Sequence, residues 1–220
     1  YASAFANCYM DEIRIVKGLA VYTGNFTVPT SRLSTTWAAN PFGGSNTVAN
    51  STAANTKLLI HSNQQADSSP NGYLITTNNA VESQTEKKYG GSSWKFDGTD
   101  DWLSVSDAII PKLDAIGTGA LTLELWFRTP DTTTEQGLVN FSIAGNNPAS
   151  GIGISLRGDR SPDQFEVLLA GSNNVFEFAW SANTWYHIAL TRSASGGTCR
   201  FFINGQMRNQ NSATTHTFTA

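Results

Sequence analysis

The feature that most constrains the fold is a period-two alternation of apolar and polar side chains in the second half of the chain. The clearest case is residues 121–128 (LTLELWFR), and the alternation returns in residues 152–156, 165–169, 176–180 and 186–191. Alternate side chains of a strand point to opposite faces, so each segment predicts a strand with one apolar face. Turn signals separate the segments, and no helical periodicity lies between them. The pattern therefore predicts an all-β protein, built as an antiparallel sandwich or barrel.

Two local signals refine this prediction. Asn204-Gly205 predicts a type I′ turn, because both central residues of that turn need a positive φ, which Asn and Gly tolerate. The turn would join a strand over residues 199–203 to one that begins near Gln206. Residues 106–116 contain the one helical pattern, and Pro111 favours a short turn there.

The composition excludes some classes of partner. Charged residues make up 14% of the chain, the net charge is −3, and no basic run exceeds Lys87-Lys88, so no nucleic-acid partner is expected. No apolar run approaches the ~18–20 residues that cross a bilayer, so no membrane insertion is expected. Ser, Thr and Asn fill 66 positions, a surface chemistry common in extracellular and virion proteins. Cys8 and Cys199 are predicted to be two buried free thiols, with a disulfide between them as the open alternative.

Residues 34–56 differ in composition from the rest of the chain. They are rich in Ala, Asn, Ser, Thr and Gly, and Trp37 and Phe42 are their only aromatic residues. We interpret this segment as a linker. A flexible chain of this length would span about 25–30 Å on average, which is enough to cross one face of a sandwich.

Several segments, taken in order, resemble the laminin-G-like, or concanavalin-A-like, jelly-roll family. They are residues 58–61 (LLIH) with the polar loop that runs from Asp67 to Gly72, residues 96–103 (FDGTDDWL), 121–127 (LTLELWF), 185–192 (WYHIALTR) and 201–205 (FFING). Residues 11–17 (DEIRIVK), 22–26 (YTGNF) and Pro29 resemble the last strand of the family and its exit. The resemblance implies an antiparallel β-sandwich of the jelly-roll type.

The order of these segments is unusual, because the closing strand precedes the body. The resemblance implies that residues 1–33 are the last strand and exit of a preceding or swapped unit, and that residues 57–220 are a body without its own last strand. An open jelly roll exposes unpaired backbone groups and an apolar face. We therefore expect the strand at residues 9–16 to fill the missing sheet position, within the chain or between neighbouring chains.

The resemblance also implies a function. Units of this type occur in tandem in phage tail, fibre and capsid-appendage proteins and in bacterial surface proteins. The expected role is a non-enzymatic structural and glycan-binding module of a phage virion appendage, on the surface of the particle. Its partners would be other virion subunits, further copies of itself through strand exchange, and a surface glycan. The alternative is a carbohydrate-binding or catalytic part of a secreted glycoside hydrolase, or an adhesin of the bacterial cell surface.

The strand acids offer little for catalysis. A retaining glycosidase needs two carboxyl groups about 5–5.5 Å apart. Glu124 is followed on its own face by Trp126 and Arg128, so no second acid arrives, and an ion pair with Arg128 is predicted instead. His187 is predicted to be a core histidine that is hydrogen-bonded to the backbone. No enzyme activity is expected.

Two groups of residues are candidates for binding. Asp97, Asp100 and Asp101 cluster in one turn and supply hard oxygen ligands that suit Ca²⁺. The alternative is that Asp97 caps the turn through backbone N–H groups while the other two are solvated. Among the aromatic residues, the candidates for stacking on a sugar are Trp102, Trp180 and Trp37.

Overall fold

The computed structural model describes residues 4–36, 53–62, 65–106, 109, 119–141, 151–169, 172–194 and 198–211. These residues form fourteen β-strands and no α-helix, which confirms the all-β prediction. None of the described segments is therefore a helix that is long and apolar enough to cross a membrane. Residues 37–52 of the predicted linker lie outside the described residues, as does most of the predicted turn over residues 106–116.

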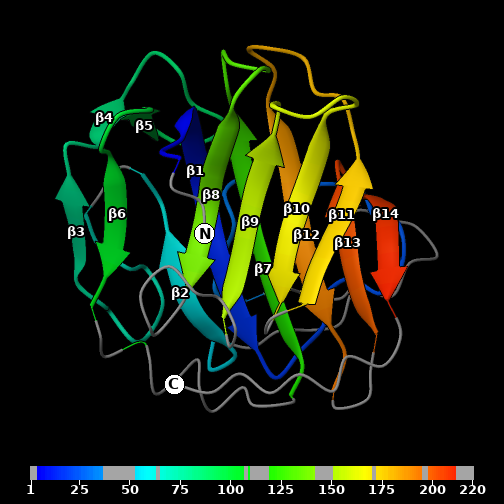
Figure 1. Cartoon of the computed structure of the whole chain (residues 1–220). Helices are drawn as coiled ribbons and strands as arrows, with labels where there is room; N and C mark the ends of the chain where they lie inside the picture. Colours follow the sequence, from blue (N-terminus) through cyan, green and yellow to red (C-terminus); the bar gives the residue numbers. More distant parts are fainter. Residues whose placement is uncertain are drawn as a thin grey trace.

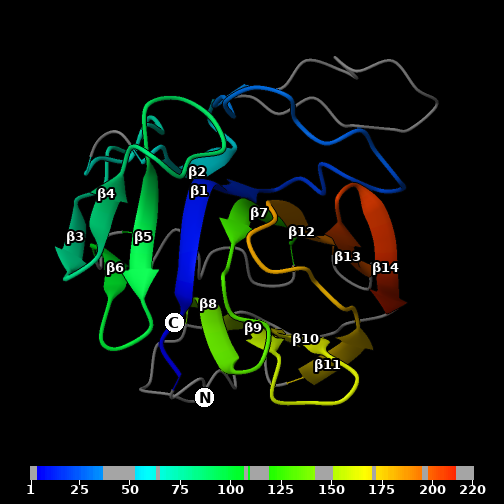
Figure 2. The same ribbon diagram turned by 90° about the horizontal axis from the view of Figure 1, so that it is seen from above.

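The strands form two stacked antiparallel sheets and one separate strand pair (Figure 1). The larger sheet has the order β14 (Gln206–Asn211), β13 (Cys199–Ile203), β12 (Tyr186–Arg192), β7 (Leu121–Arg128), β1 (Asn7–Lys17), β5 (Ser93–Asp97) and β4 (Val81–Ser83), and β2 (Thr56–Ile60) also pairs with β1. The smaller sheet has the order β11 (Ser172–Glu177), β10 (Gln164–Leu169), β9 (Ile152–Arg157) and β8 (Glu135–Phe141). The separate pair is β3 (Ile75–Asn78) with β6 (Trp102–Val105). Figure 2 shows the smaller sheet stacked against the central strands of the larger one, so the predicted sandwich is confirmed.

The main core lies between the two sheets, and the alternation in the sequence explains its composition. The apolar side chains of β7 are fully buried there, against residues such as Phe165 of the smaller sheet. Each fully buried side chain of this size stabilises the fold by roughly 1.5–3 kcal/mol relative to an exposed one. The core is therefore the main source of stability.

Strand β1 occupies the centre of the larger sheet. One of its edges pairs with β7 from Tyr9, opposite Arg128, to Lys17, opposite Leu121, with one interruption. Its other edge pairs first with β5 and then with β2. The N-terminal strand thus fills a sheet position within the same chain.

A bulge in β1 marks the point where its neighbour changes from β5 to β2. The pairing with β7 is irregular between Asp11 and Arg14, and Glu12 has a φ of 55°. The Asp11 carboxylate accepts hydrogen bonds from the backbone N–H groups of Glu12, Lys88 and Tyr89. The carboxylate therefore satisfies backbone donors at the place where the regular ladder is interrupted.

The segment after β1 covers the outer face of the larger sheet, and we call residues 18–34 the strap. Figure 2 shows it running along this face toward β13 and β14. Tyr22 and Phe26 of the strap stack with ring centroids 3.6 Å apart, and both are buried in a second apolar cluster with Phe202. Because of this cover, both faces of the sheet's central strands are buried.

The predicted turn between β13 and β14 is confirmed. Asn204 has a φ of 49° and Gly205 a φ of 75°, as a type I′ turn requires. The N–H of Phe26 donates to the Gly205 carbonyl over 2.8 Å, and a Cβ atom at Gly205 would collide with the Phe26 carbonyl oxygen. The close approach of the strap to this hairpin therefore requires glycine at this position.

Candidate functional site

The acid on the central strand belongs to a buried network beneath the strap. Glu124 is paired with Arg14, whose Nε donates to Oε1 over 2.8 Å, and its Oε2 accepts from the Tyr22 hydroxyl over 2.7 Å. The predicted pair with Arg128 is wrong, since Arg128 contacts Glu86 instead. The prediction of a backbone partner for the His187 side chain is also wrong: its Nε2 lies 3.1 Å from Glu124 Oε2.

This network is structural in character. Burial by itself would raise the pKa of Glu124, but the charge of Arg14 and the hydrogen bonds from His187 and Tyr22 lower it to about 2. All four side chains are almost fully excluded from solvent. A substrate cannot reach these four side chains without removal of the strap. Because Tyr22 belongs to the strap and donates to Glu124, the network holds the strap on the sheet.

The cluster of acids lies in the turn between β5 and β6. Gly98 has a φ of 87°, and the turn is closed by the N–H of Asp97, which donates to Asp101 Oδ2 over 2.7 Å. The N–H of Thr99 donates to Asp97 Oδ1 over 2.8 Å, so Asp97 does cap the turn as the alternative prediction proposed. The same alternative expected Asp101 to be solvated, and this is wrong, because Asp101 is buried and its carboxylate accepts from the backbone. The capping role and a cation-binding role are compatible, because each uses different oxygen atoms.

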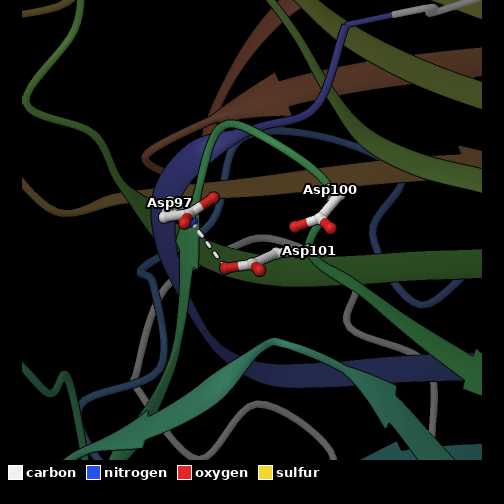
Figure 3. A group of neighbouring side chains, drawn as sticks. All are labelled: Asp97, Asp100 and Asp101. Carbon is white, nitrogen blue, oxygen red and sulfur yellow. Dashed lines mark hydrogen bonds between the residues drawn. The ribbon is translucent and has the colours of Figure 1, made fainter.

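The three carboxylates converge on one small volume. One ligand oxygen from each of Asp97, Asp100 and Asp101 lies within 4.8 Å of the others, and Figure 3 shows the carboxylates turned toward one another. Asp101 is buried, whereas Asp97 and Asp100 are exposed. The site thus opens to solvent on one side and rests on the protein on the other.

Trp102 is the aromatic side chain next to this turn. It begins β6, opposite Asn78 of β3, and 44% of its surface is exposed. The next residue, Leu103, points the other way and packs against the main core. The alternation of the strand thus places the Trp102 ring on the outer surface of the β3–β6 pair.

Two amides that the sequence did not single out complete the surroundings of the turn. Asn78 Nδ2 donates to the Asp100 carbonyl over 2.8 Å, and Asn79 Nδ2 donates to Asp100 Oδ2 over 2.9 Å. Asn79 has a φ of 55°, typical of a turn position that Asn tolerates. The pair Asn78-Asn79 stands out in the sequence as a turn signal, but nothing in the sequence places it beside Asp100.

The other two aromatic candidates do not join this site. Trp180 is only 4% exposed, its ring lies 5.7 Å from that of Phe165, and its Nε1 donates to the Asp131 carbonyl. It is a core residue, so its prediction as a sugar-stacking residue is not supported by its position. Trp37 lies outside the described residues.

The two cysteines do not form a disulfide. Cys8 and Cys199 are both buried thiols outside any disulfide, as predicted. Burial raises the pKa of the Cys8 thiol far above its usual range, which keeps it protonated and unreactive.

The architecture defines a lectin-type β-sandwich with a polar turn and an exposed tryptophan at one end. A laminin G family model, described as the concanavalin A-like lectin/glucanases superfamily, matches residues 97–220, more than half of the chain. The chain therefore belongs to this superfamily, and the resemblance seen in the sequence is confirmed. It is a module of the carbohydrate-binding type. Neither the curated proteins nor the solved structures gave a match.

Proposed function

We propose that this chain is a non-enzymatic module that binds a glycan at the end of the β3–β6 pair. The observation that carries the proposal is the half-exposed ring of Trp102 beside the amides and carboxylates of the acidic turn. Binding sites for small polar ligands combine an apolar or aromatic platform with a few fixed polar groups. A pyranose ring has an apolar C–H face and a rim of hydroxyl groups, so it matches this combination.

Each neighbour of Trp102 has a defined part in this arrangement. The face of the indole ring offers about the area of one sugar ring for stacking. Asn78 and Asn79 use their amide N–H groups to hold Asp100, which leaves their Oδ1 atoms to accept hydrogen bonds from sugar hydroxyls. Because the amides are held by Asp100, their side chains lose little further freedom on binding.

The proposal of a non-enzymatic role is supported by the state of the buried acids. Among the described strand acids, Asp11, Glu12 and Glu124 are at most 1% exposed, and all three are held by hydrogen bonds to neighbouring groups. A general acid or nucleophile must contact the scissile glycosidic bond. The three acids of the turn come from one short loop, and each carboxylate already accepts a hydrogen bond from a neighbouring group of that turn or of Asn79.

We further propose that the module belongs to a virion appendage, such as a phage tail fibre, where it contributes to assembly and to attachment. The low charge and the many hydroxyl and amide side chains support this role. A secreted glycoside hydrolase or a bacterial adhesin is the alternative.

A glycan array tests the binding proposal. The wild type is compared with Trp102→Ala and with Met207→Ala. The second variant is a control that truncates a similarly exposed apolar residue on β14, an edge strand of the larger sheet that lies on the other side of the molecule from the β3–β6 pair (Figure 1). We expect the wild type and Met207→Ala to bind the same glycans and Trp102→Ala to lose at least tenfold in affinity. Equal binding by all three proteins refutes the site, and no binding by the wild type refutes glycan binding. Release of reducing ends from a bound glycan favours the hydrolase.

A further inference from the structure

We propose that the outer face of β4, β5 and β1 is a docking surface for a second copy of this chain, related to the first by a two-fold axis. This inference does not depend on the binding of a glycan, because Trp102 lies on the separate β3–β6 pair. We call the surface the β5 face, and its members are Val81, Lys95 and Tyr9 in the middle, Lys87 and Lys88 at one end, and Asp97 and Asp100 at the other.

The middle of the β5 face is a row of three side chains on neighbouring strands. Lys95 of β5 is directly opposite Val81 of β4 on one side and Tyr9 of β1 on the other. Its neighbours along the strand, Trp94 and Phe96, are buried in the main core, so Lys95 and the residues opposite it point outward. Val81 is 54% exposed. Val81 and Tyr9 thus form an apolar and aromatic centre of the kind that protein interfaces bury.

Opposite charges lie at the two ends of this row. Figure 2 shows the loop between β4 and β5 at one end of β5 and the turn that leads to β6 at the other. The loop carries Lys87 and Lys88, whereas Asp97 ends the strand and Asp100 follows in the turn. At roughly 3.3 Å per residue, Ser93 and Asp97 are about 13 Å apart, which exceeds the screening length of about 10 Å in 0.1 M salt. The charges at the two ends therefore interact only weakly within one chain.

The charges of the β5 face have no ion-pair partner among the described residues. Lys88 Nζ lies over the ring of Trp126, 4.0 Å from its centroid, and no described carboxylate contacts it. The other lysines and the acids of the face likewise lack an ion pair in the described part of the chain. By contrast, Arg157 on the smaller sheet contacts three carboxylates. The face thus presents two sets of charges that a partner can neutralise.

A two-fold axis brings the two ends together. In such an interface the same patch of both copies is used, so each contact is made twice. With the axis near Phe96, Lys95 of one copy is opposite Asp97 of the other, because both residues are one position from Phe96. The lysines of each loop then approach the acidic turn of the other copy. A parallel arrangement would place like charges together, and charge complementarity therefore selects the two-fold orientation.

The size of the β5 face determines the strength of the contact. Three short strands and two loops form a surface at the low end of specific interfaces, so we expect a Kd on the order of 10⁻⁴ M. Self-association of this strength has an effect where copies are held close together, since tethering raises the effective concentration to about 1 mM. The virion appendage proposed above provides such a setting.

Analytical ultracentrifugation of the full chain without any glycan tests the docking surface. In 0.1 M NaCl the wild type should show a monomer–dimer equilibrium between about 10 µM and about 1 mM protein. In 1 M NaCl, where the screening length falls to about 3 Å, the Kd should rise at least tenfold. Lys95→Glu and Asp97→Lys each place like charges at both symmetric contacts, and each should weaken the dimer at least tenfold. The double variant exchanges the two charges and should dimerise within about threefold of the wild type.

Two further variants separate docking from other effects. Asp97→Lys also removes the cap of the turn, so Asp100→Lys, which changes an exposed side chain, is the second acidic variant and should weaken the dimer at least threefold. Glu177→Lys reverses an exposed acid on β11 of the smaller sheet and should dimerise like the wild type. Thermal unfolding checks that each variant is folded.

Four results would overturn the docking surface. They are a wild type that stays monomeric up to about 1 mM, a Lys95→Glu variant that dimerises as tightly as the wild type, a double variant no better than the single ones, and an equal loss in Glu177→Lys. Loss of glycan binding in Trp102→Ala with dimerisation unchanged keeps the two proposals distinct.

Discussion

Replacement of Arg14 by Met tests how much the buried charges beneath the strap contribute to stability. The substitution keeps an unbranched side chain of similar length but removes the charge and the donors. Arg14 and Glu124 are both completely buried, and Arg14 also donates to the Ser34 carbonyl of the strap over 2.9 Å. The variant would leave Glu124 as a buried carboxylate held only by Tyr22 and His187.

The expected loss follows from the cost of an uncompensated buried charge. Breaking a buried ion pair by removing one partner costs about 3–5 kcal/mol of the free energy of unfolding. With a urea m-value of about 2 kcal/mol per M, the midpoint of unfolding at pH 7 should fall by about 1.5–2.5 M. The same substitution at Arg160, which is half-exposed and 3.5 Å from Asp159, should cost less than about 1 kcal/mol.

The dependence on pH provides a second estimate of the same interaction. In the folded protein the pKa of Glu124 is lowered from 4.5 to about 2, so its stabilising effect is complete above pH 4.5 and is lost as the pH falls toward 2. This difference corresponds to about 3 kcal/mol. The wild type should therefore lose more stability than Arg14→Met between pH 5 and pH 2.5, because removal of Arg14 raises the folded pKa.

Urea unfolding followed by tryptophan fluorescence measures both effects. The reasoning is refuted if Arg14→Met and Arg160→Met have the same midpoint at pH 7, or if Arg14→Met loses as much stability in acid as the wild type. The double variant with Glu124→Gln adds a check: if the two residues form one unit, the combined loss should be clearly smaller than the sum of the single losses.

Three further predictions concern the strap, its hairpin and the cysteines. Tyr22→Phe removes the hydroxyl that donates to Glu124 and should lower the free energy of unfolding in urea by about 1–3 kcal/mol. The Tm should also be lower, and the far-UV spectrum should be unchanged. Gly205→Ala should destabilise the protein by more than about 2 kcal/mol in thermal unfolding, because the added Cβ collides with Phe26 and the φ of 75° is unfavourable for Ala. A Tm equal to that of the wild type would contradict the close approach of the strap. A thiol reagent should label Cys8 and Cys199 only after unfolding, and rapid labelling of both in the native protein would contradict their burial.

The sandwich could be predicted because its strands obey a simple alternation, but the burial of the second face could not. In β7 the polar residues Thr122 and Glu124 are buried as completely as the leucines between them. The strap that covers them is an irregular segment of about seventeen residues, with no periodicity to mark which face it packs on. Tyr22 and Phe26 stand in the sequence within the segment that resembles the exit of the family's last strand, but nothing there shows that their rings stack on each other.

The partner of Glu124 was missed for a geometric reason. Residues i and i+4 of a strand share a face but lie about 13 Å apart, at roughly 3.3 Å per residue. Directly opposite residues of neighbouring strands have Cβ atoms only about 5 Å apart. Arg14 is opposite Glu124 in the pairing of β1 with β7, so it, and not Arg128, is within reach. That pairing joins residues 110 positions apart and cannot be read from either segment alone.

The acidic turn was predicted with more success, since its three residues are close in sequence and must be close in space. Their proximity and the capping by Asp97 follow from the motif itself. The contact of Asn79 with Asp100 and the buried Oδ1 of Asp101, which has no hydrogen-bond partner among the described residues, are revealed only by the structure. Trp180 and Trp102 likewise look alike in the sequence and differ only in their burial.

The central place of β1 has a consequence for how the chain folds. In the described part of the larger sheet, β1 alone joins the β7–β12–β13–β14 half to the strands β2, β5 and β4. Because β1 is synthesised before β7, it must wait, unpaired on its β7 edge, until about one hundred further residues have been synthesised. Such long loop closures slow folding, and we expect the two halves to merge in one late and cooperative step on a timescale of milliseconds to seconds or longer.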